Sequence, residues 1–340
     1  MTTVVVTGAA GFIAGYVVEE LLDRGCHVIG LDNYSKYGEV ARAYDGDPNY
    51  RFVEGDAKDT MLMTELLLEA DYCIAGAARI GGISYFHEYT YDLLAENERI
   101  IASTCDAAIR AHGEGRLQRV TYLSSSMVFE STESWPSVEG DERVVPPPAS
   151  SYGFQKLAVE YFARAAYDQY GLPFTIVRPF NCVGIGEARA VGDNVVLSGN
   201  VELAMSHVVP DLIQKIYKGQ DPLHILGDGS QIRHYTYGAD LAAGIVTAFS
   251  HPGAVNEDFN LSTGTSTTVL ELAATIWRKL RGDDEFRYVS DPPFEHDVQR
   301  RIPATEKANE ILGFKATTTL DDMLDIVIPW VTDAVDKGRI

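Results

Sequence analysis

The chain has 340 residues, which is enough to bury the core of one large α/β domain or of two closely joined ones. Its formal net charge of −21 argues against nucleic acid or an anionic membrane as the main partner. An anionic substrate must then be held by a few locally placed cations. The four cysteines, Cys26, Cys73, Cys105 and Cys182, lack the spacing of metal ligands and are typical of reduced, buried thiols in a cytoplasmic protein.

The apolar start of the chain, residues 1–22, lacks the basic segment of a signal peptide and is interrupted by Gly8, Gly11, Glu19 and Glu20. We interpret it as a strand, a turn and a helix. No later stretch is long and apolar enough to span a bilayer, so we expect no membrane partner.

Short apolar runs alternate with longer helical patterns through the first half of the chain. The runs predict strands over 3–7, 27–32, 50–54, 72–75, 119–124 and 174–178. The helical patterns predict helices over 17–24, 61–69, 96–112 and 152–170. Because the strands are almost continuously apolar, this α/β alternation predicts a doubly wound parallel sheet of the Rossmann type.

The composition changes after Arg178. Gly, Asn and Val are mixed over 184–201, a helix is predicted over 210–218, and a turn follows at 227–230. This pattern predicts a smaller, mixed α/β region that closes over the carboxyl edge of the sheet. We expect a sheet domain over 1–180, later segments near 234–262 that return to it, and a substrate-binding region over 181–340.

A glycine turn joins the first predicted strand to the first helix. Gly8 permits the tight turn, and Gly11 lets backbone N–H groups approach a pyrophosphate at the positive end of the helix. Ala14 is tolerated at the third glycine position, which needs only close packing. Asp32 ends the second strand, where a carboxylate accepts both ribose hydroxyls and repels a 2′-phosphate, so NAD is favoured over NADP. Asp56, after the third strand, either flanks the adenine or caps a helix.

Tyr152 and Lys156 share one face of a predicted helix, whose N-cap is Ser150 or Ser151. A lysine ammonium beside a phenol favours the phenolate, as does a positive nicotinamide ring, and this makes Tyr152 a usable general base. The hydroxyls of 124–126 end a strand upstream and point into the crevice at the carboxyl edge of the sheet. Each motif alone is more often structural.

In this order the motifs resemble the extended short-chain dehydrogenase/reductase family, in its NAD-dependent sugar epimerase/dehydratase branch. The resemblance runs from Val4 to about Trp330. Besides the glycine turn and the Tyr-x-x-x-Lys, it rests on RPFN at 178–181, SHVVP at 206–210, GDGSQIR at 227–233 and DVQRR at 297–301.

The resemblance implies a role for each matching residue. Tyr152 takes the proton of a sugar hydroxyl while NAD receives the hydride, Lys156 holds the nicotinamide ribose and tunes Tyr152, and Ser125, or failing it Ser126, orients the substrate. The implied dinucleotide contacts are Gly8, Gly11, Phe12, Ile13, Asp32, Asn33, Asp56, Ala57, Ala75, Ala77, Asn97, Tyr152, Lys156 and Pro179. The implied substrate contacts are Gly82, Ser126, Asn181, His207, Val208, Arg233, Arg300 and Arg301; Asn181, Arg233 and one of the last two arginines hold the diphosphate.

The residues after Ser125 bear on the reaction. Family members that dehydrate or decarboxylate the sugar carry an acid where this chain has Ser126 and Met127, neither of which exchanges protons usefully at neutral pH. The segments 77–83 and 206–208 are also similar to GDP-fucose synthase, and the Gly-Gly turn to GDP-mannose 3,5-epimerase. Those enzymes use a cysteine at the position of Met127, and Asp32 opposes NADP-dependent reduction.

We therefore expect tightly bound NAD and epimerisation at C4 of a nucleotide sugar, through a transient 4-keto sugar that turns about its diphosphate. One alternative is an NDP-sugar lyase whose second acid is Glu130 or His207. Another is an inactive NAD-binding scaffold. The nucleotide and the sugar stay unassigned.

The helices at 96–112 and 152–170 have apolar faces that suit a two-fold four-helix interface, so we expect a homodimer. These faces carry Ile100, Ile101 and Ala108 in the first helix and Leu157, Ala158 and Tyr161 in the second. The alternative is that they pack only on their own sheet.

Overall fold

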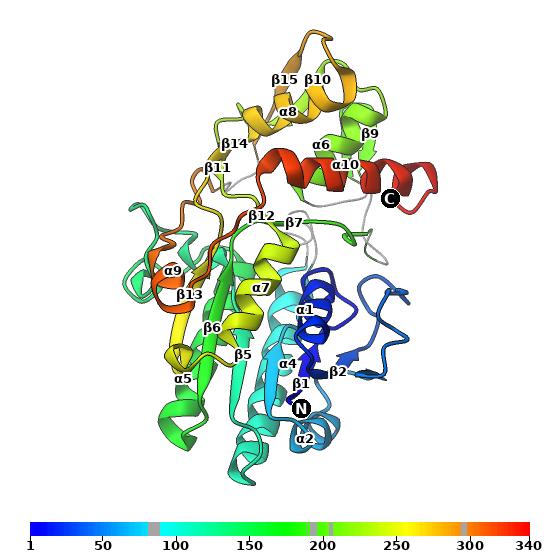
Figure 1. Cartoon of the computed structure of the whole chain (residues 1–340). Helices are drawn as coiled ribbons and strands as arrows, with labels where there is room; N and C mark the ends of the chain where they lie inside the picture. Colours follow the sequence, from blue (N-terminus) through cyan, green and yellow to red (C-terminus); the bar gives the residue numbers. More distant parts are fainter. Residues whose placement is uncertain (81–88, 189, 191–195, 204–206, 294–297) are drawn as a thin grey trace.

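The computed structural model describes the chain except residues 81–88, 189, 191–195, 204–206 and 294–297 (Figure 1). Its centre is a parallel sheet of seven strands in the order β13-β6-β5-β4-β1-β2-β3. The strands are β1 (Thr3–Thr7), β2 (His27–Asp32), β3 (Tyr50–Glu54), β4 (Tyr72–Ala75), β5 (Arg119–Leu123), β6 (Phe174–Pro179) and β13 (Glu257–Leu261). The strand order reverses between β1 and β4, where a ligand crevice opens in sheets of this kind. The predicted doubly wound fold is confirmed.

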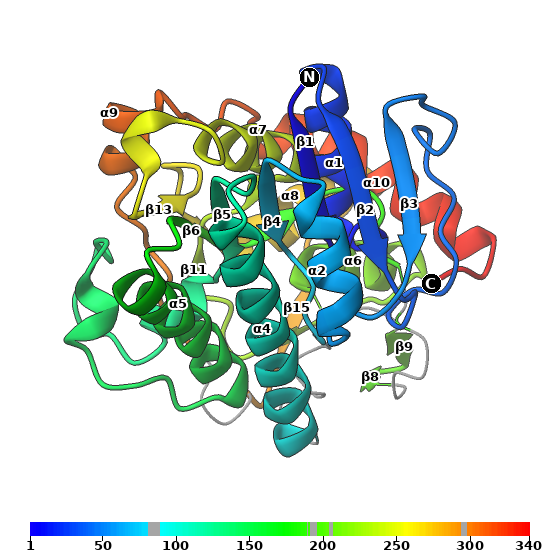
Figure 2. The same cartoon turned by 90° about the horizontal axis from the view of Figure 1, so that it is seen from below.

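Two helical layers cover the sheet, as Figure 2 shows from below. One layer holds α1 (Phe12–Asp23), α7 (Gly238–Ala248) and α9 (Glu306–Leu312). The other holds α2 (Thr60–Leu68), α4 (Thr90–Gly113) and α5 (Ser151–Tyr170). Side chains alternate between the layers along each strand, so that Val4 and Val6 pack in the first core and Val5 in the second. Burial on both faces explains why the inner strands β1, β2 and β4 are almost continuously apolar.

Helix starts were the least accurate predictions. α1 begins at Phe12 and not at residue 17, because the glycine turn itself leads directly into the helix. α4 begins at Thr90 and not at residue 96. α6 (Val208–Tyr217) includes Pro210 in its first turn, where a missing N–H has no intrahelical partner to lose.

A smaller mixed region lies beyond the carboxyl ends of the strands (Figure 1). Its core is formed by α6, α8 (Val269–Arg281) and α10 (Leu320–Asp336), with β10 (Leu223–Leu226) paired in parallel to β15 (Tyr288–Asp291). Its short strands are β7 (Cys182–Val183), β8 (Val196–Ser198), β9 (Val201–Leu203), β11 (Ile232–Arg233), β12 (Thr236–Tyr237) and β14 (Thr267–Thr268). The 3-10 turns among the described residues are η1 (Ser126–Phe129), η2 (Asp141–Arg143) and η3 (Pro252–Ala254).

The chain passes between the two regions several times. β6 leads directly into β7, which pairs with β12, and β12 leads into α7 on the sheet. β13 then joins the sheet beside β6 before the chain returns to α8. Within the described ranges, no helix combines the length and the apolar character that crossing a membrane requires.

Candidate functional site

The glycine turn between β1 and α1 needs glycine at two positions. Gly8 has a φ of +75°, and a Cβ there would lie 3.0 Å from the backbone of Ala77. A Cβ on Gly11 would lie 2.8 Å from the carbonyl oxygen of Gly8. No side chain caps the start of α1, so its first-turn N–H groups remain available to an anion, beside Phe12 and Ile13.

Asp32 closes the turn at the end of β2. Its carboxylate accepts hydrogen bonds from the backbone N–H of Ala10 at 3.1 Å and of Tyr34 at 2.7 Å. Burial raises the pKa of Asp32, and these hydrogen bonds oppose that rise. The carboxylate is thus fixed beside the glycine turn, where the dinucleotide ribose is expected.

The segment after β3 is hydrogen-bonded to the residue that follows Asp32. Asn33 donates through Nδ2 to Asp56 at 3.2 Å, and Asp56 also accepts from the N–H of Lys58 at 2.9 Å. The cap of α2 is Asp59, which accepts from two backbone N–H groups of the first turn. The interpretation of Asp56 as the helix cap was therefore wrong, and Asp56 and the buried Ala57 precede the helix.

Two polar residues fix the loop after β4. Thr7, which the sequence analysis missed, accepts through Oγ1 from the N–H of Gly76 at 3.2 Å and of Ala77 at 3.1 Å. Asn97 on α4 accepts from the N–H of Arg79 at 2.7 Å and donates to its carbonyl at 3.0 Å. The amide of Asn97 thus holds this loop. Ala75 and Pro179 end β4 and β6 at the same edge of the sheet, and Gly82 lies outside the described residues.

The structure brings Ser125 and Tyr152 together. Ser125 caps η1 by accepting from the N–H of Met127 at 3.2 Å, and it shares a hydrogen bond with the Tyr152 hydroxyl. Ser126 is buried within η1. Burial raises the pKa of Tyr152, while the hydrogen bond from Ser125 and the positive charge of Arg301 act to lower it. The pKa of Tyr152 is thus raised overall, and Ser125 and Arg301 oppose that rise by stabilising the phenolate.

Lys156 is buried one turn further along α5. Its Nζ donates to the carbonyl of Leu123 at 2.9 Å, and burial lowers its pKa to about 8. The helix is held at its start by Ser150, the N-cap, which accepts from the N–H of Gly153 at 3.0 Å. Tyr152 and Lys156 thus face the end of β5 from successive turns.

The two residues considered as a second acid are both engaged elsewhere. Glu130 accepts from the backbone N–H of Ser150 at 3.0 Å and from its hydroxyl at 2.7 Å, so it anchors the start of α5. His207 contacts the carboxylate of Glu187 through Nδ1 and precedes Val208, the first residue of α6. Its side chain is 54% exposed, and desolvation of the ring, with the nearby charges of Lys36 and Arg301, lowers the pKa of His207 to about 4.

Two arginines and an amide border the site on the side of the smaller region. Asn181 has a φ of 38°, and within the described part of the chain its buried Nδ2 has no hydrogen-bond partner. Arg233 is 8% exposed at the end of β11. Arg301 is half-buried, and its charge acts on Tyr152 and His207. These groups are suited to an anionic ligand.

Arg300 points elsewhere. It is exposed, and its guanidinium lies over the Trp135 ring, 5.4 Å from the centroid. The Trp135 indole donates to the carbonyl of Arg300 at 3.1 Å, and the N–H of Ser137 donates to the carbonyl of Ile302 at 2.8 Å. The loop that follows the three serines therefore holds the segment that carries Arg301.

A further pocket adjoins Arg233, whose Nη1 is 3.4 Å from the carbonyl oxygen of Gln299. The pocket is lined by Gly227, Asp228, Gln231, Ser290, Asp291, Pro293 and Gln299.

Arg42 was also missed by the sequence analysis. Its Nη2 donates to the carbonyls of Ala10 at 3.0 Å and of Gly11 at 3.2 Å, so it binds the glycine turn from outside. Arg42 lies in an irregular segment, and no local pattern marks it.

Comparison with known proteins agrees with this geometry. Residues 4–262 match the model of the NAD dependent epimerase/dehydratase family. A UDP-glucose 4-epimerase of Bifidobacterium longum is 28% identical over 342 residues, covering 98% of this chain and 97% of its own. A solved structure of UDP-glucose 4-epimerase from Bifidobacterium longum with NAD+ and UDP is 25% identical, covers 98% of this chain and 99% of its own, and has a TM-score of 0.80. UDP-glucose 4-epimerase of Thermotoga maritima, solved with UDP-glucose, is 25% identical, covers 98% of this chain and 100% of its own, and has a TM-score of 0.81.

The match spans the glycine turn, Ser125, Tyr152, Lys156, Arg233 and β13. It therefore includes the carboxyl edge of the sheet and the elements that return to it. The chain belongs to the NAD dependent epimerase/dehydratase family.

Proposed function

We propose that the chain is an NAD-dependent nucleotide-sugar 4-epimerase. The observation that carries the proposal is the Ser125–Tyr152 hydrogen bond at the carboxyl edge of the sheet, where the charge of Arg301 also acts on Tyr152. The named relatives are UDP-glucose 4-epimerases, which favours a UDP-sugar as the substrate.

The residues present fit a dinucleotide, since no side chain caps the first-turn N–H groups of α1 and the Asp32 carboxylate is fixed beside the glycine turn. NAD, when bound, supplies the acceptor and later the donor of the hydride. Tyr152 accepts the proton of the sugar C4 hydroxyl, which Ser125 orients, and returns it after the sugar has turned. Lys156, whose Nζ donates to the carbonyl of Leu123, would hold the nicotinamide ribose.

The cationic border keeps the substrate in place while its sugar moves. Asn181, Arg233 and Arg301 hold the diphosphate, and the pocket beside Arg233 receives the nucleoside. Binding energy from the nucleotide is thereby used to position the reacting carbon.

Elimination is the second candidate, and the structure gives it little support. Ser126 and Met127 are buried in η1 where an acid would be required, and Glu130 is engaged at the start of α5. These residues leave Tyr152 as the proton acceptor and favour epimerisation.

A panel of UDP-, GDP- and TDP-sugars, incubated without added cofactor, tests the proposal. We expect purified protein to carry NAD and to interconvert C4 epimers of unchanged mass, as resolved by chromatography and mass spectrometry. Accumulation of a product that has lost water or carbon dioxide would replace epimerisation with elimination.

Arg301 and Arg300 offer a matched pair of substitutions. Arg301→Met should raise the KM for the nucleotide sugar about 10- to 100-fold, because a charge-assisted contact with the diphosphate is lost. Arg300→Met should change it less than about twofold, because its side chain is solvated and lies over Trp135. Steady-state kinetics of the two variants measure this, and equal effects would refute the assignment of Arg301.

We also propose a homodimer through the outer faces of α4 and α5. Phe154 and Tyr161 are exposed on α5, Tyr161 to 61%. Ile101, Ala108 and Leu157 were expected in this interface but are buried within their own subunit. Light scattering of the wild type and of Tyr161→Glu tests the proposal, which requires the variant to be monomeric.

We place the protein in the cytoplasm. Its four cysteines are free, and Cys26, Cys73 and Cys105 are buried. Free thiols of this kind are typical of a reducing compartment.

A further inference from the structure

The helix α5 contacts the end of β5 at three successive turns. Tyr152 hydrogen-bonds Ser125, and Lys156 donates to the carbonyl of Leu123 at 2.9 Å. Glu160, a further turn along, accepts from the hydroxyl of Ser124 at 2.6 Å. The spacing of four residues places all three side chains on one face of the helix. The third contact has no part in the mechanism described above.

The Ser124–Glu160 contact is enclosed and well fixed. Ser124 is 4% exposed and Glu160 1% exposed. The N–H of Ser124 donates to the carbonyl of Val177 at 2.9 Å, which holds its backbone against β6. A hydrogen bond to a carboxylate in such an environment is strong and directional.

The carboxylate of Glu160 is itself held by Arg178. The guanidinium donates through Nε to Oε1 at 2.7 Å and through Nη2 to Oε2 at 2.6 Å. This two-bond geometry fixes the plane of the carboxylate as well as its position. Arg178 comes from β6, the neighbour of β5, so the same arginine ties α5 to the sheet.

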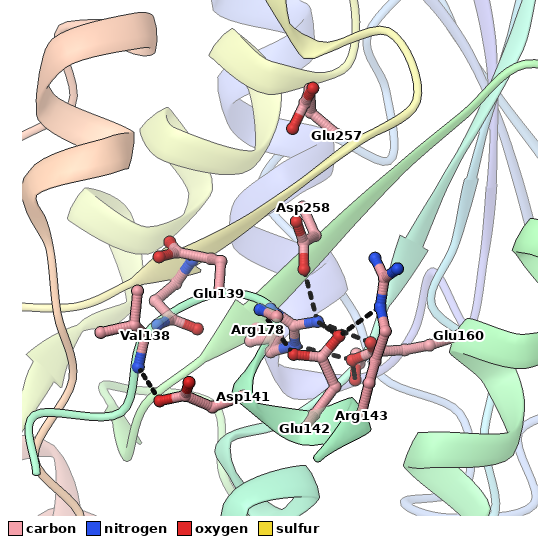
Figure 3. A network of polar contacts seen from close by, with 12 residues as sticks. Val138, Glu139, Asp141, Glu142, Arg143, Glu160, Arg178, Glu257 and Asp258 are labelled. Carbon is pink, nitrogen blue, oxygen red and sulfur yellow. Dashed lines mark hydrogen bonds and ion pairs between the residues drawn. The ribbon is translucent and has the colours of Figure 1, made fainter.

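Arg178 is in turn the centre of a buried ionic network (Figure 3). It lies 2.7 Å from Asp258 on β13 and 3.1 Å from Glu142 in η2, and Arg164 pairs with both of these carboxylates. Glu142, Glu160 and Asp258 come close enough together to hold a metal ion, but the guanidinium of Arg178 makes an ion pair with each of them. The network therefore anchors α5 to the sheet.

We propose that Glu160, acting through Ser124, positions Ser125 against the hydroxyl of Tyr152. Glu160 is a positioning residue, since it touches neither substrate nor dinucleotide. Ser124 adjoins Ser125 in the chain, so a shift of the Ser124 side chain moves the hydroxyl that the mechanism requires. The inference rests on the proposed roles of Ser125 and Tyr152.

The network does not need Ser124 for its charge balance. Arg178 already makes two hydrogen bonds to Glu160, and Arg164 adds a second cation 3.7 Å from the same carboxylate. The hydroxyl of Ser124 instead connects this ionic network to the reacting end of β5. Loss of that contact should therefore affect turnover more than folding.

Ser124→Ala and Glu160→Asp test the inference. The first removes the hydroxyl, and the second withdraws the carboxylate by one methylene while keeping its charge. We expect kcat to fall about tenfold with KM unchanged, because the hydroxyls of Ser125 and Tyr152 are no longer aligned. Since the hydrogen bond from Ser125 lowers the pKa of Tyr152, its weakening should move the acid limb of the kcat/KM profile up by about half a pH unit.

Glu142→Asp is the matched control. Glu142 and Glu160 are each 1% exposed in their side chains and each pair with Arg178, but Glu142 lies in η2 and not on α5. Glu142→Asp should leave kcat and the pH profile near wild type even if it lowers the denaturation midpoint. Equal loss of kcat in Glu142→Asp and Glu160→Asp, or a wild-type kcat and pH profile in Ser124→Ala, would overturn the inference.

A separate result decides whether the proposed function itself has failed. If the wild type does not epimerise any nucleotide sugar, or if Tyr152→Phe is fully active, the proposed function is wrong. If the wild type is active, Tyr152→Phe is inactive and Ser124→Ala is normal, only the role of Glu160 is wrong. An ultraviolet titration of Ser124→Ala, taken as the difference from Ser124→Ala/Tyr152→Phe, measures the pKa of Tyr152 without reference to activity.

Discussion

Tyr152→Phe is expected to lower kcat about a thousandfold, within the range that a positioned general base contributes. The phenyl ring keeps the packing at the start of α5 but cannot accept the proton of the sugar hydroxyl. Dinucleotide content should be retained, because the glycine turn and Asp32 are unaltered. Single-turnover assays and extraction of bound NAD from the purified variant measure the two quantities.

Tyr161→Phe is the control for this substitution. Tyr161 lies on the same helix and is 61% exposed, so the loss of its hydroxyl should leave kcat unchanged. A Tyr152→Phe variant that retained more than a tenth of wild-type kcat would show that another group accepts the proton.

Arg178→Met is expected to destabilise the fold by about 3–5 kcal/mol at neutral pH, the range for removing one partner of a buried ion pair. Arg178 is 0% exposed, and three carboxylates converge on it. Without the guanidinium these carboxylates repel one another in a site that water does not reach. Urea denaturation of the two proteins measures the difference.

The difference in unfolding free energy between the wild type and Arg178→Met should become smaller at acidic pH. Burial acts to raise the pKa of Asp258, but Arg178 and Lys307 outweigh it and hold the pKa well below its ordinary range. In the wild type the ionised carboxylate therefore contributes stability above its unfolded pKa of about 4, and that contribution is lost as the pH falls further. In the variant the crowded carboxylates bind protons more readily, so the deficit should shrink between about pH 7 and pH 5.

Arg143→Met tests whether the effect of Arg178→Met depends on burial of the ion pair or only on the loss of a positive charge. Arg143 also pairs with Glu142, at 3.4 Å, but its side chain is 53% exposed. An exposed pair contributes less than about 1 kcal/mol, so this variant should unfold close to wild type at both pH values. A deficit in Arg178→Met that did not depend on pH would contradict the electrostatic explanation.

The strands of the sheet could be predicted from sequence because burial on both faces leaves a distinct pattern. β2 occupies His27–Asp32, where a continuous apolar run stops at a carboxylate. β5 ends at Leu123, one residue before the predicted end, because Ser124 turns into η1. The start of α1 was misjudged because periodicity cannot be read through a glycine turn.

The residues of the site likewise divide into those that could be predicted from the sequence and those that could not. Tyr152 and Lys156 follow from local spacing and Ser125 from the family resemblance, and their proximity then follows from the order of strands in a parallel sheet. Arg300 and Arg301 could not be separated, because neighbouring residues in an extended segment point to opposite sides and register decides which one faces the site.

The ionic network under α5 depends on contacts that no local pattern records. Arg178 meets Asp258 only because β13 pairs with β6, and Glu142 reaches it from a loop. Thr7 and Arg42 were missed for the same reason. Their partners are backbone groups distant in the chain, and a hydrogen bond to a backbone group leaves no trace in residue type.

The return of α7 and β13 to the sheet has a consequence for how the chain can be divided. A fragment that stopped near residue 180 would leave β6 as an open edge strand, with its row of unpaired N–H and C=O groups exposed. It would also uncover the apolar surface of α1 that α7 protects. Residues 1–180 are thus not expected to fold as an independent domain. Such a fragment is expected to associate with other copies through the open edge of β6.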